Sequence, residues 1–148
     1  MPVYELRQND YLVSTDRAQL DISYIAALLS RTYWAKNRCS EKQVLRSCEN
    51  SLCFGLYENG KQIGFARVIT DHVFFGYLCD VCVDENYRGR GLGKLLVRAV
   101  AECPELKGLS KIMLATSDAH GLYKRFGWTA LANPENMLEL RPEKPPVS

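Results

Sequence analysis

The sequence predicts a single α/β domain in which a mixed β-sheet carries helices on its faces. Two observations lead to this prediction. The length of 148 residues suits one domain, and segments rich in β-branched residues alternate along the chain with segments of helical periodicity. Hydrophobic residues make up 47% of the chain, which is enough for one continuous core. Disordered and collagen-like chains are therefore excluded.

Charge and cysteine content narrow the class of protein further. The 19 basic and 17 acidic residues leave a net charge of +2, too weak a field to favour nucleic acid or a membrane surface. The first ten residues lack the apolar core of a secretion signal, and no stretch approaches the roughly 18 apolar residues of a membrane span. The six cysteines do not form the dense framework of a small secreted scaffold. We expect a cytoplasmic protein without a nucleic-acid or membrane partner.

Two helices are predicted near the N-terminus, after one short strand. Apolar residues recur at helical spacing between positions 20 and 34, and Asp21 is placed to cap the start of that helix. Ser40 and Gln43 have the spacing of a capping box, which predicts the start of a second helix.

Three strands should follow these helices. Residues 52–57 and 63–69 are apolar and β-branched, and Asn59-Gly60 between them tolerates the positive φ angles of a tight hairpin turn. Residues 73–83 are apolar nearly throughout, which is typical of a central strand covered on both faces.

The C-terminal third should close the sheet. A helix is predicted over residues 92–103 and stops at Pro104, and a strand over residues 111–115 precedes a short helix capped by Asp118 and ended by Gly127. Two further strands are expected at the end of the fold. They comprise residues 128–131 and 137–140. The folded domain should then cover residues 1–141, followed by a flexible proline-rich tail at 142–148.

The densest chemical signal lies at residues 84–94, between the 73–83 strand and the following helix. A glycine-rich loop at a helix N-terminus binds anions, because unpaired amides point outward and glycines let a phosphate approach the backbone. Arg88, Arg90 and Lys94 add positive charge there. A dinucleotide fingerprint would need glycine where Lys94 stands, and a P-loop would need glycine in place of Arg88 and a hydroxyl residue in place of Leu95.

The spacing Arg88-x-x-Gly91-x-Gly93 resembles the pyrophosphate-binding motif of the GNAT superfamily of acyl-CoA-dependent N-acyltransferases. The apolar residues 81–83 before the motif, the leucine-rich helix after it and the segment 121–128, Gly-Leu-Tyr-Lys-Arg-Phe-Gly-Trp, are similar to that family as well. The resemblance covers nearly the whole chain. It implies a single-domain fold with a mixed, mostly antiparallel β-sheet and helices on both faces.

The resemblance also implies how acetyl-CoA, the acyl donor, is held. Loop amides would bind the pyrophosphate, and the strand before the loop would pair with the pantetheine arm and polarise the thioester carbonyl. The implied binding residues are Val81, Cys82, Val83, Arg88, Gly89, Arg90, Gly91, Leu92, Gly93 and Lys94. Tyr123 matches the tyrosine that protonates the leaving thiolate, a role that suits a hydroxyl protonated at neutral pH. The alternative for Tyr123 is a buried aromatic residue that only packs.

A general base for the amine is the less defined part of the site. Asp80 is the first candidate, because a carboxylate inside an apolar strand is costly unless it is paired or functional. Strand alternation places Asp80 on the face of Leu78 and Cys82. A structural carboxylate that pairs with Arg67 or accepts loop amides is an equally supported interpretation. The reserve candidates are Asp71, His72, Asp118 and His120.

Acceptor specificity should come from the first two helices and the hairpin. The segment 33–38 contains Tyr33 and Trp34, which are candidates for a substrate wall, and Arg67 is a candidate for holding a substrate carboxylate. No metal is expected, because Cys79 and Cys82, three apart in a strand, should point to opposite faces. The cysteines are interpreted as small core residues.

The sequence thus favours an acetyl-CoA-dependent N-acetyltransferase that transfers acetyl directly to a primary amine of a small-molecule acceptor. The alternative is a non-catalytic module that binds acyl-CoA or a nucleotide. The oligomeric state is left open between a monomer and a homodimer.

Overall fold

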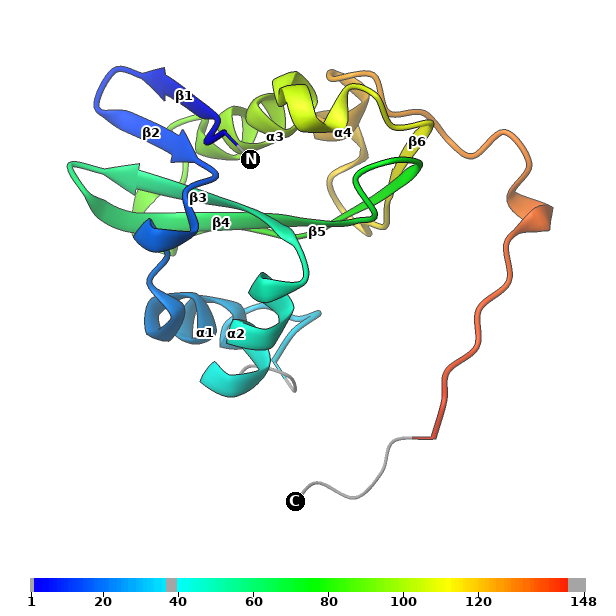
Figure 1. Ribbon diagram of the computed structural model, residues 1–148, viewed down its shortest axis with the longest axis horizontal. Coiled ribbons are helices and arrows are strands. Elements are labelled where there is room, and N and C mark those ends of the chain that lie inside the picture. The colour runs from blue at the N-terminus through cyan, green and yellow to red at the C-terminus, as the bar shows by residue number, and fades with distance from the viewer. Residues whose placement is uncertain (1, 37–39, 144–148) are drawn as a thin grey trace.

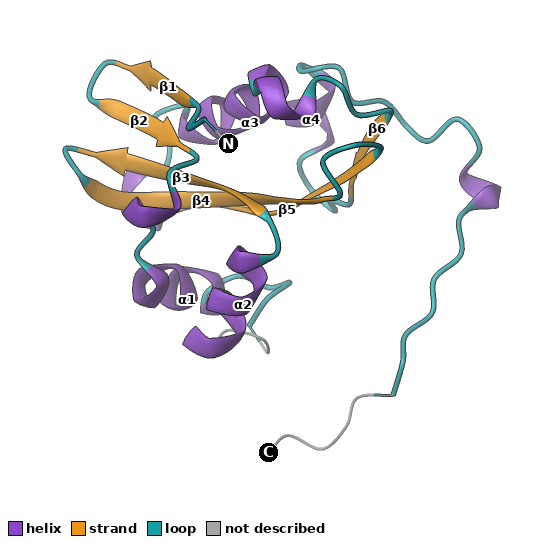
Figure 2. Ribbon diagram, viewed as in Figure 1, coloured by secondary structure: helices purple, strands orange, loops and turns teal. Residues whose placement is uncertain are grey.

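The computed structural model describes residues 2–36 and 40–143, which form a six-stranded sheet with helices on both faces (Figures 1 and 2). The strands follow one another in chain order across the sheet. They are β1 (Glu5–Gln8), β2 (Tyr11–Ser14), β3 (Leu52–Glu58), β4 (Lys61–Thr70), β5 (Phe75–Val83) and β6 (Lys111–Leu114). Neighbouring strands are antiparallel up to β5, and β5 pairs with β6 in parallel. The predicted fold class is confirmed.

Two helices cover each face of the sheet (Figure 2). One face carries α1 (Ile22–Ser30) and α2 (Glu41–Glu49), and the other carries α3 (Leu92–Glu102) and α4 (His120–Lys124). Each face has its own buried cluster. The cluster under α3 joins Phe54 and Leu56 of the sheet to Leu96 of the helix, and the cluster under α1 and α2 joins Phe65 of the sheet to Ile25 of α1. The sheet is therefore buried on both sides, as expected for a central strand such as β5.

Local signals in the sequence locate the starts and turns of these elements correctly. The Asp21 carboxylate accepts a hydrogen bond of 3.0 Å from the Tyr24 amide and caps α1. Ser40 and Gln43 form both bonds of a capping box at α2. Asn59 and Gly60 have φ angles of 49° and 83°, so the predicted tight turn joins β3 to β4.

Two expectations about the chain ends are wrong. The N-terminal segment is a hairpin of two strands, β1 and β2, rather than one strand, and Asn9 turns it with a φ of 55°. Residues 128–131 and 137–140 form no strands, and a single 3-10 turn, Pro134–Asn136, lies between them. The Trp128 indole donates a hydrogen bond of 3.1 Å to the Ile112 carbonyl of β6. A side chain therefore occupies a backbone acceptor of β6 with which residues 128–131 would have paired as a strand.

The C-terminal arm, defined as residues 133–143, leaves the body of the protein instead of closing the sheet (Figure 1). The predicted tail at 142–148 is described only for its first two residues, and the remainder lies outside the described residues. Within residues 2–36 and 40–143, no helix is long and apolar enough to cross a membrane.

A bulge in β5 overturns the predicted strand alternation. Arg67 of β4 is in register with Cys79, and Phe65 is in register with Cys82, so β5 carries one extra residue at this point. Asp80 lies in the bulge with a φ of 57°. Because of the extra residue, Leu78 packs in the cluster under α3, whereas Cys82 packs in the cluster under α1 and α2.

The bulge also corrects the interpretation of the cysteine pair. Cys79 and Cys82 lie in register with Arg67 and Phe65, two residues apart on β4, so both thiols belong to the same face of the sheet. Four cysteines are buried, as interpreted from the sequence, and Cys79 is half-buried. Cys39 lies outside the described residues. In the part of the chain that is described, no group of three or more His, Cys, Asp or Glu residues is placed to hold a metal ion.

Candidate active site

The candidate site lies where β5 and β6 separate. The two strands are in register only from Phe75–Lys111 to Leu78–Leu114. Residues 81–83 continue β5 beyond the end of this ladder, and β4 pairs with their other edge through Gly64 and Phe65. The other backbone edge of residues 81–83 points toward β6 but is not paired with it. This edge therefore faces the space between the two separating strands.

The glycine-rich loop follows this part of β5 directly. Gly91 is the N-cap of α3 with a φ of 74°, and no side chain caps the helix. Gly89 is left-handed too, with a φ of 82°. A Cβ atom built at Gly89, Gly91 or Gly93 meets nothing within 4 Å, so the loop surface is open. The uncapped amides of the first turn of α3 are thus available to an anion, as the sequence indicates.

The three cations of the loop are not equivalent. Arg88 and Lys94 are exposed beside the loop. Arg90 instead turns toward the N-terminal hairpin, where its Nη1 atom donates to the Tyr11 hydroxyl at 2.9 Å and its guanidinium lies 5.0 Å from the centre of the Tyr87 ring. Arg90 therefore has contacts that fix the loop, whereas the side chains of Arg88 and Lys94 make no hydrogen bond or ion pair with the described residues.

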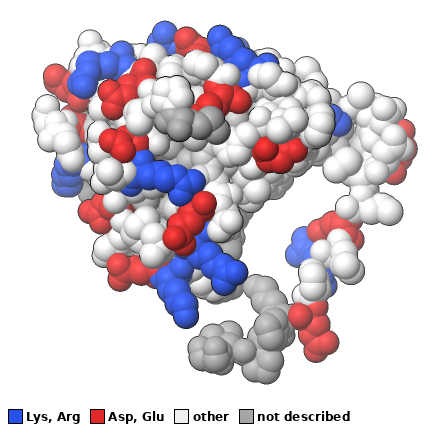
Figure 3. Space-filling model, viewed as in Figure 1, with Lys and Arg blue, Asp and Glu red and all other residues white. Residues whose placement is uncertain are grey.

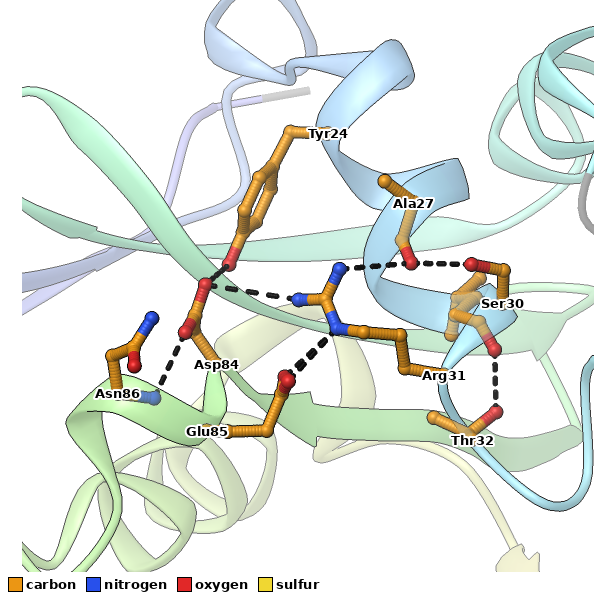
Figure 4. A network of polar contacts seen from close by, with 9 residues as sticks. Tyr24, Ala27, Ser30, Arg31, Thr32, Asp84, Glu85 and Asn86 are labelled. Atoms are coloured by element: carbon orange, nitrogen blue, oxygen red, sulfur yellow. Dashed lines mark hydrogen bonds and ion pairs between the residues drawn. The ribbon is translucent and has the colours of Figure 1, made fainter.

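A polar network joins the start of this loop to α1 (Figure 4). The Tyr24 hydroxyl donates to Asp84 at 2.9 Å, and Arg31 Nε donates to both oxygens of Glu85 at 3.0 and 2.9 Å. Partial burial disfavours ionisation of Asp84, but bonds from the Asn86 amide and Tyr24, together with the charge of Arg31, outweigh it and lower its pKa. Asp84 is therefore ionised at neutral pH and holds α1 against the loop.

Tyr24 and Arg31 were not identified from the sequence as site residues. Their partners are 54 to 60 positions away in the chain, and no motif links the two segments. Arg31 is nevertheless the C-cap of α1, two positions before Tyr33. The network thus connects the loop that resembles a pyrophosphate site to the segment predicted to form the acceptor wall.

Replacing Arg31 by alanine is expected to lower the free energy of unfolding only modestly, by about 0.5–1 kcal/mol, because the Arg31 and Glu85 side chains are 43% and 45% exposed. The loss should shrink in 1 M salt, which screens exposed charges. Urea unfolding at low and high salt measures both effects.

Folding lowers the pKa of Asp84, so its carboxylate contributes in full to the free energy of unfolding above its ordinary pKa of 3.8. This contribution is lost as the pH falls through the lower pKa that Asp84 has in the folded protein.

Tyr123 lies on α4 at the edge of the core under α3. It is 9% exposed, and its ring meets Trp128 edge-on at 5.9 Å. Burial raises the pKa of its hydroxyl, with smaller contributions from the charge of Asp118 and from Tyr33. The hydroxyl therefore keeps its proton at neutral pH, as a proton donor must. Tyr123 also lines a groove of about 790 Å³ between β6, α4 and residues 126–132.

Asp80 lies at the centre of a buried polar chain. Its carboxylate accepts from Arg67 Nε at 2.7 Å and from the Trp34 indole at 3.0 Å. Arg67 Nη1 in turn donates to the Ser51 hydroxyl at 3.1 Å. The Arg67 and Asp80 side chains are 9% and 1% exposed, so the pair is closed off from solvent. The structural interpretation of Asp80 as the partner of Arg67 matches this geometry, and its role as a base stays a prediction.

The predicted acceptor residues Tyr33 and Trp34 bridge β5 and the segment after β6. Tyr33 and Trp34 pack edge-on with ring centres 5.0 Å apart, and both are exposed, at 61% and 41%. The Tyr33 hydroxyl lies 2.6 Å from the Ser117 hydroxyl in the segment after β6. Through Trp34 this aromatic pair joins the buried chain of Asp80. Arg67 is buried and bonded within that chain, and its predicted contact with a substrate stays a prediction.

The reserve candidates for the base are dispersed. Asp71 accepts three backbone amides at the end of the β4–β5 hairpin, which lower its pKa to about 2, and His72 lies 3.6 Å from Glu105. Asp118 does not cap α4, because Ala119 is the N-cap and its amide donates to Thr116 instead. His120 lines the groove together with Tyr123. Asp118 and His120 are therefore the reserve residues near Tyr123.

The comparisons with known proteins agree with this geometry. The sequence model of the Acetyltransferase (GNAT) family matches residues 22–128. A candidate acetyltransferase from Gibberella zeae is 34% identical over 138 residues, which cover 78% of this chain and 77% of that protein. The chain belongs to the GNAT acetyltransferase family.

Solved structures extend the comparison to the fold. A candidate GNAT acetyltransferase from Xanthomonas campestris superposes with a TM-score of 0.84 at 47% identity, and the match covers 88% of this chain and 92% of that one. An acetyltransferase from Clostridium acetobutylicum, solved with acetyl-CoA, superposes with a TM-score of 0.58 at 19% identity over 95% of both chains, which shows a shared fold.

Proposed function

We propose that the protein is an acetyl-CoA-dependent N-acetyltransferase that acetylates a primary amine of a small-molecule acceptor. The observation that carries this proposal is the continuity of the open edge of β5 with the uncapped N-terminus of α3 across the glycine loop. An edge that can accept a strand-like arm leads here directly to a site for phosphate groups. The acetyl-CoA bound to the Clostridium protein of the same fold supports the choice of ligand.

Each step of the proposed reaction is assigned to particular residues of this chain. The amides of the loop hold the pyrophosphate, the backbone of residues 81–83 aligns the pantetheine arm, and one amide of this segment stabilises the oxyanion that forms at the thioester carbon. A carbon–nitrogen bond forms with the amine and the carbon–sulfur bond breaks. The amine loses its proton to a base, for which Asp80 is the first proposed candidate, and Tyr123 donates a proton to the departing thiolate.

Direct transfer in a ternary complex requires the amine and the thioester to be bound together. The aromatic pair of Tyr33 and Trp34 bridges β5 and the segment after β6 and is proposed as the wall that excludes water around the acceptor. The network of Arg31 and Glu85 holds this wall against the loop, so both substrates would meet on one connected scaffold.

Calorimetric titration with acetyl-CoA tests the loop. Replacing Arg88 by alanine should weaken binding about tenfold or more, because a charge-assisted contact to phosphate is lost. Replacing Gly91 by aspartate should have a similar effect, because it places a negative charge at the uncapped N-terminus of α3, where the phosphates would bind. Arg98→Ala is the matched control, since Arg98 pairs with Glu102 on the exposed side of α3. Unchanged binding in both loop variants would remove the pyrophosphate assignment.

A non-catalytic module that binds acyl-CoA or a nucleotide is the alternative, and the glycine loop supports it equally. Both functions predict binding of CoA, so a thiol-release assay with a panel of small primary amines separates them. Release of CoA that depends on an amine supports the enzyme and identifies the class of acceptor. Binding of acetyl-CoA without release for any amine favours the module.

A further inference from the structure

Two buried thiols that the proposed reaction does not use lie together where α2 turns into β3. Cys48 lies in the last turn of α2 and Cys53 lies in β3, and both are free thiols with 3% and 2% exposure. The Cys53 Sγ atom lies 3.6 Å from the carbonyl oxygen of Cys48, and the two side chains contact each other as well. Two thiols in contact are placed to form a disulfide when an oxidant reaches them.

The two thiols differ in reactivity. Contact with the Cys53 thiol lowers the pKa of Cys48, burial opposes this shift, and the charge of Arg67 adds to it. Contact with Cys48 and burial both raise the pKa of Cys53. The thiolate is the form of cysteine that attacks an oxidant. Cys48 is therefore the nucleophile of the pair, and Cys53 is the thiol that keeps its proton.

Two arginines hold the turn between α2 and β3. Arg17 Nη2 donates to the Ser51 carbonyl at 2.8 Å and to the Glu49 carbonyl at 3.3 Å. Arg67 is in register with Cys53 across the β3–β4 ladder, and its Nη1 atom donates to the Ser51 hydroxyl at 3.1 Å. Positive charge close to a thiol stabilises the thiolate, so this corner of the protein favours the reactive form of cysteine.

The other described cysteines are less suited to this chemistry. Burial raises the pKa of Cys82 and of Cys103. Cys79 and Cys53 lie in register with Arg67 from opposite sides, so two strand spacings, about 10 Å, separate their Cα atoms. A disulfide needs Cα atoms within about 7 Å. Contact therefore selects Cys53 as the partner of the reactive thiol.

We propose that Cys48 and Cys53 are a redox-sensitive pair that hydrogen peroxide oxidises to a disulfide, and that this bond loosens the buried polar chain of Asp80. The Cys48 thiolate attacks one oxygen of the peroxide, the O–O bond breaks and hydroxide leaves, which makes Cys48 a sulfenic acid. The Cys53 sulfur then attacks the Cys48 sulfur, and the hydroxyl leaves with the Cys53 proton as water. The two thiols lose two electrons in total, and the peroxide is reduced to water.

The surface above the pair suits a small oxidant. The exposed residues Glu49 and Asn50 form the turn between the two cysteines, and the exposed face of α2 carries charged side chains of both signs (Figure 3). The thiols lie beneath this polar layer. Hydrogen peroxide is small and uncharged, so a local opening of the turn admits it, whereas bulky thiol reagents are kept out.

Ser51 connects the pair to the candidate site. A disulfide holds its sulfur atoms about 2 Å apart, closer than two thiols in contact, so the turn has to tighten around Ser51. The Ser51 hydroxyl accepts from Arg67, and the same guanidinium holds Asp80 at 2.7 Å. Asp80 accepts from the Trp34 indole at 3.0 Å. A displacement of Ser51 therefore reaches the aromatic pair through two buried side chains.

Peptide mapping of the full chain is the first test. Trypsin releases residues 47–61 as one peptide that contains both cysteines. After peroxide treatment of the folded protein, this peptide should resist alkylation and be lighter by two hydrogen atoms, and a dithiol reductant should reverse both changes. The peptides with Cys82 and Cys103 should still be alkylated. A peptide 47–61 that stays alkylated at both cysteines, or that is joined to another peptide, overturns the proposal.

Single variants test the order of the two steps. Cys53→Ser removes the second thiol, so peroxide should leave a sulfenic acid on Cys48 that dimedone traps. Cys48→Ser should give no trapped product at Cys53. Cys103→Ser is the matched control, because Cys103 is a buried thiol in the cluster under α3, and the disulfide should form in it as in the wild type. Trapping at Cys53 in the Cys48→Ser variant contradicts the assigned nucleophile.

The link to the buried chain has a spectroscopic readout. Oxidation should move the NMR resonance of the Trp34 indole N–H, because its acceptor Asp80 belongs to the chain that Ser51 holds. The Trp128 indole, which donates to Ile112, should keep its resonance. A variant with serine at both cysteines of the pair should not respond to peroxide. A fixed Trp34 resonance in protein with the mapped disulfide overturns the link.

The consequence for catalysis rests on the proposed function, whereas the disulfide and the Trp34 resonance do not. Oxidation should raise the KM of the active amine about fivefold or more, as is typical of coupled sites, and leave the Kd of acetyl-CoA unchanged. A KM that oxidation does not change contradicts an effect on the acceptor side. If no amine is acetylated, the proposed function fails, and the peptide map and the resonance still decide on the redox pair.

Discussion

Replacing Tyr123 by phenylalanine is expected to lower kcat by about a hundredfold or more while the Kd for acetyl-CoA stays nearly unchanged. The substitution removes only the hydroxyl group, and proton donation to a leaving group contributes on the order of 10²–10⁴ to the rate. The ring would keep its packing against Trp128. Steady-state kinetics with the active amine, together with calorimetry on the same sample, separate the two quantities.

The dependence of kcat on pH is a second check on the role of Tyr123. Burial raises the pKa of Tyr123 above its ordinary value of 10.0, so the donor form persists through neutral pH and is lost only above pH 10. Tyr4→Phe is the matched control, because Tyr4 precedes β1 at the edge of the sheet opposite to β6 and burial raises the pKa of its hydroxyl too. A Tyr123→Phe variant with the kcat of the wild type would exclude Tyr123 from the mechanism.

Replacing Asp80 by alanine is expected to cost about 3–5 kcal/mol of folding free energy, because it leaves the buried Arg67 without its partner. Urea unfolding measures this loss. The double variant Asp80→Asn with Arg67→Met should recover most of the stability, since it removes both charges and keeps an oxygen for the Trp34 indole. Recovery of stability is the signature of an ion pair that is costly only when broken.

The same double variant decides between the two interpretations of Asp80. If the carboxylate is the general base, kcat falls although the protein is stable. If Asp80 only positions Trp34 and Arg67, kcat is kept and any change appears in the KM of the amine. Single replacement of Asp80 would not separate these cases, because a destabilised site loses activity for either reason.

The sequence was most informative where function depends on the backbone itself. Glycines at 89 and 91 are needed for left-handed φ angles at the start of α3, so the open turn before this helix could be recognised from residue type and spacing alone. The capping residues Asp21 and Ser40 and the Asn59-Gly60 turn act through neighbours within a few positions. Such interactions are local, and for that reason they can be read from the chain.

Contacts between distant segments could not be derived in this way. The pairing of Arg31 with Glu85 and of Trp34 with Asp80 joins residues 46 to 54 positions apart, and no spacing rule connects them. The bulge at Asp80 was missed because alternation assumes a regular strand. One extra residue places Leu78 and Cys82 on opposite faces of the sheet, where alternation predicts the same face. Residues 137–140 have the composition of a strand but form none, because composition alone does not supply a strand to pair with.

The left-handed backbone of Asp80 limits what can replace it, whatever its chemistry. At a φ of 57° most side chains clash with their own carbonyl groups, while aspartate, asparagine and glycine tolerate the conformation. A library that randomises position 80 in an Arg67→Met background, where no buried charge is left unpaired, should therefore return mainly these three residues when it is selected for folding alone. Selection for acetyl transfer would then act only on the few side chains that this backbone tolerates. The geometry of the strand therefore limits the variation at position 80 before the reaction does.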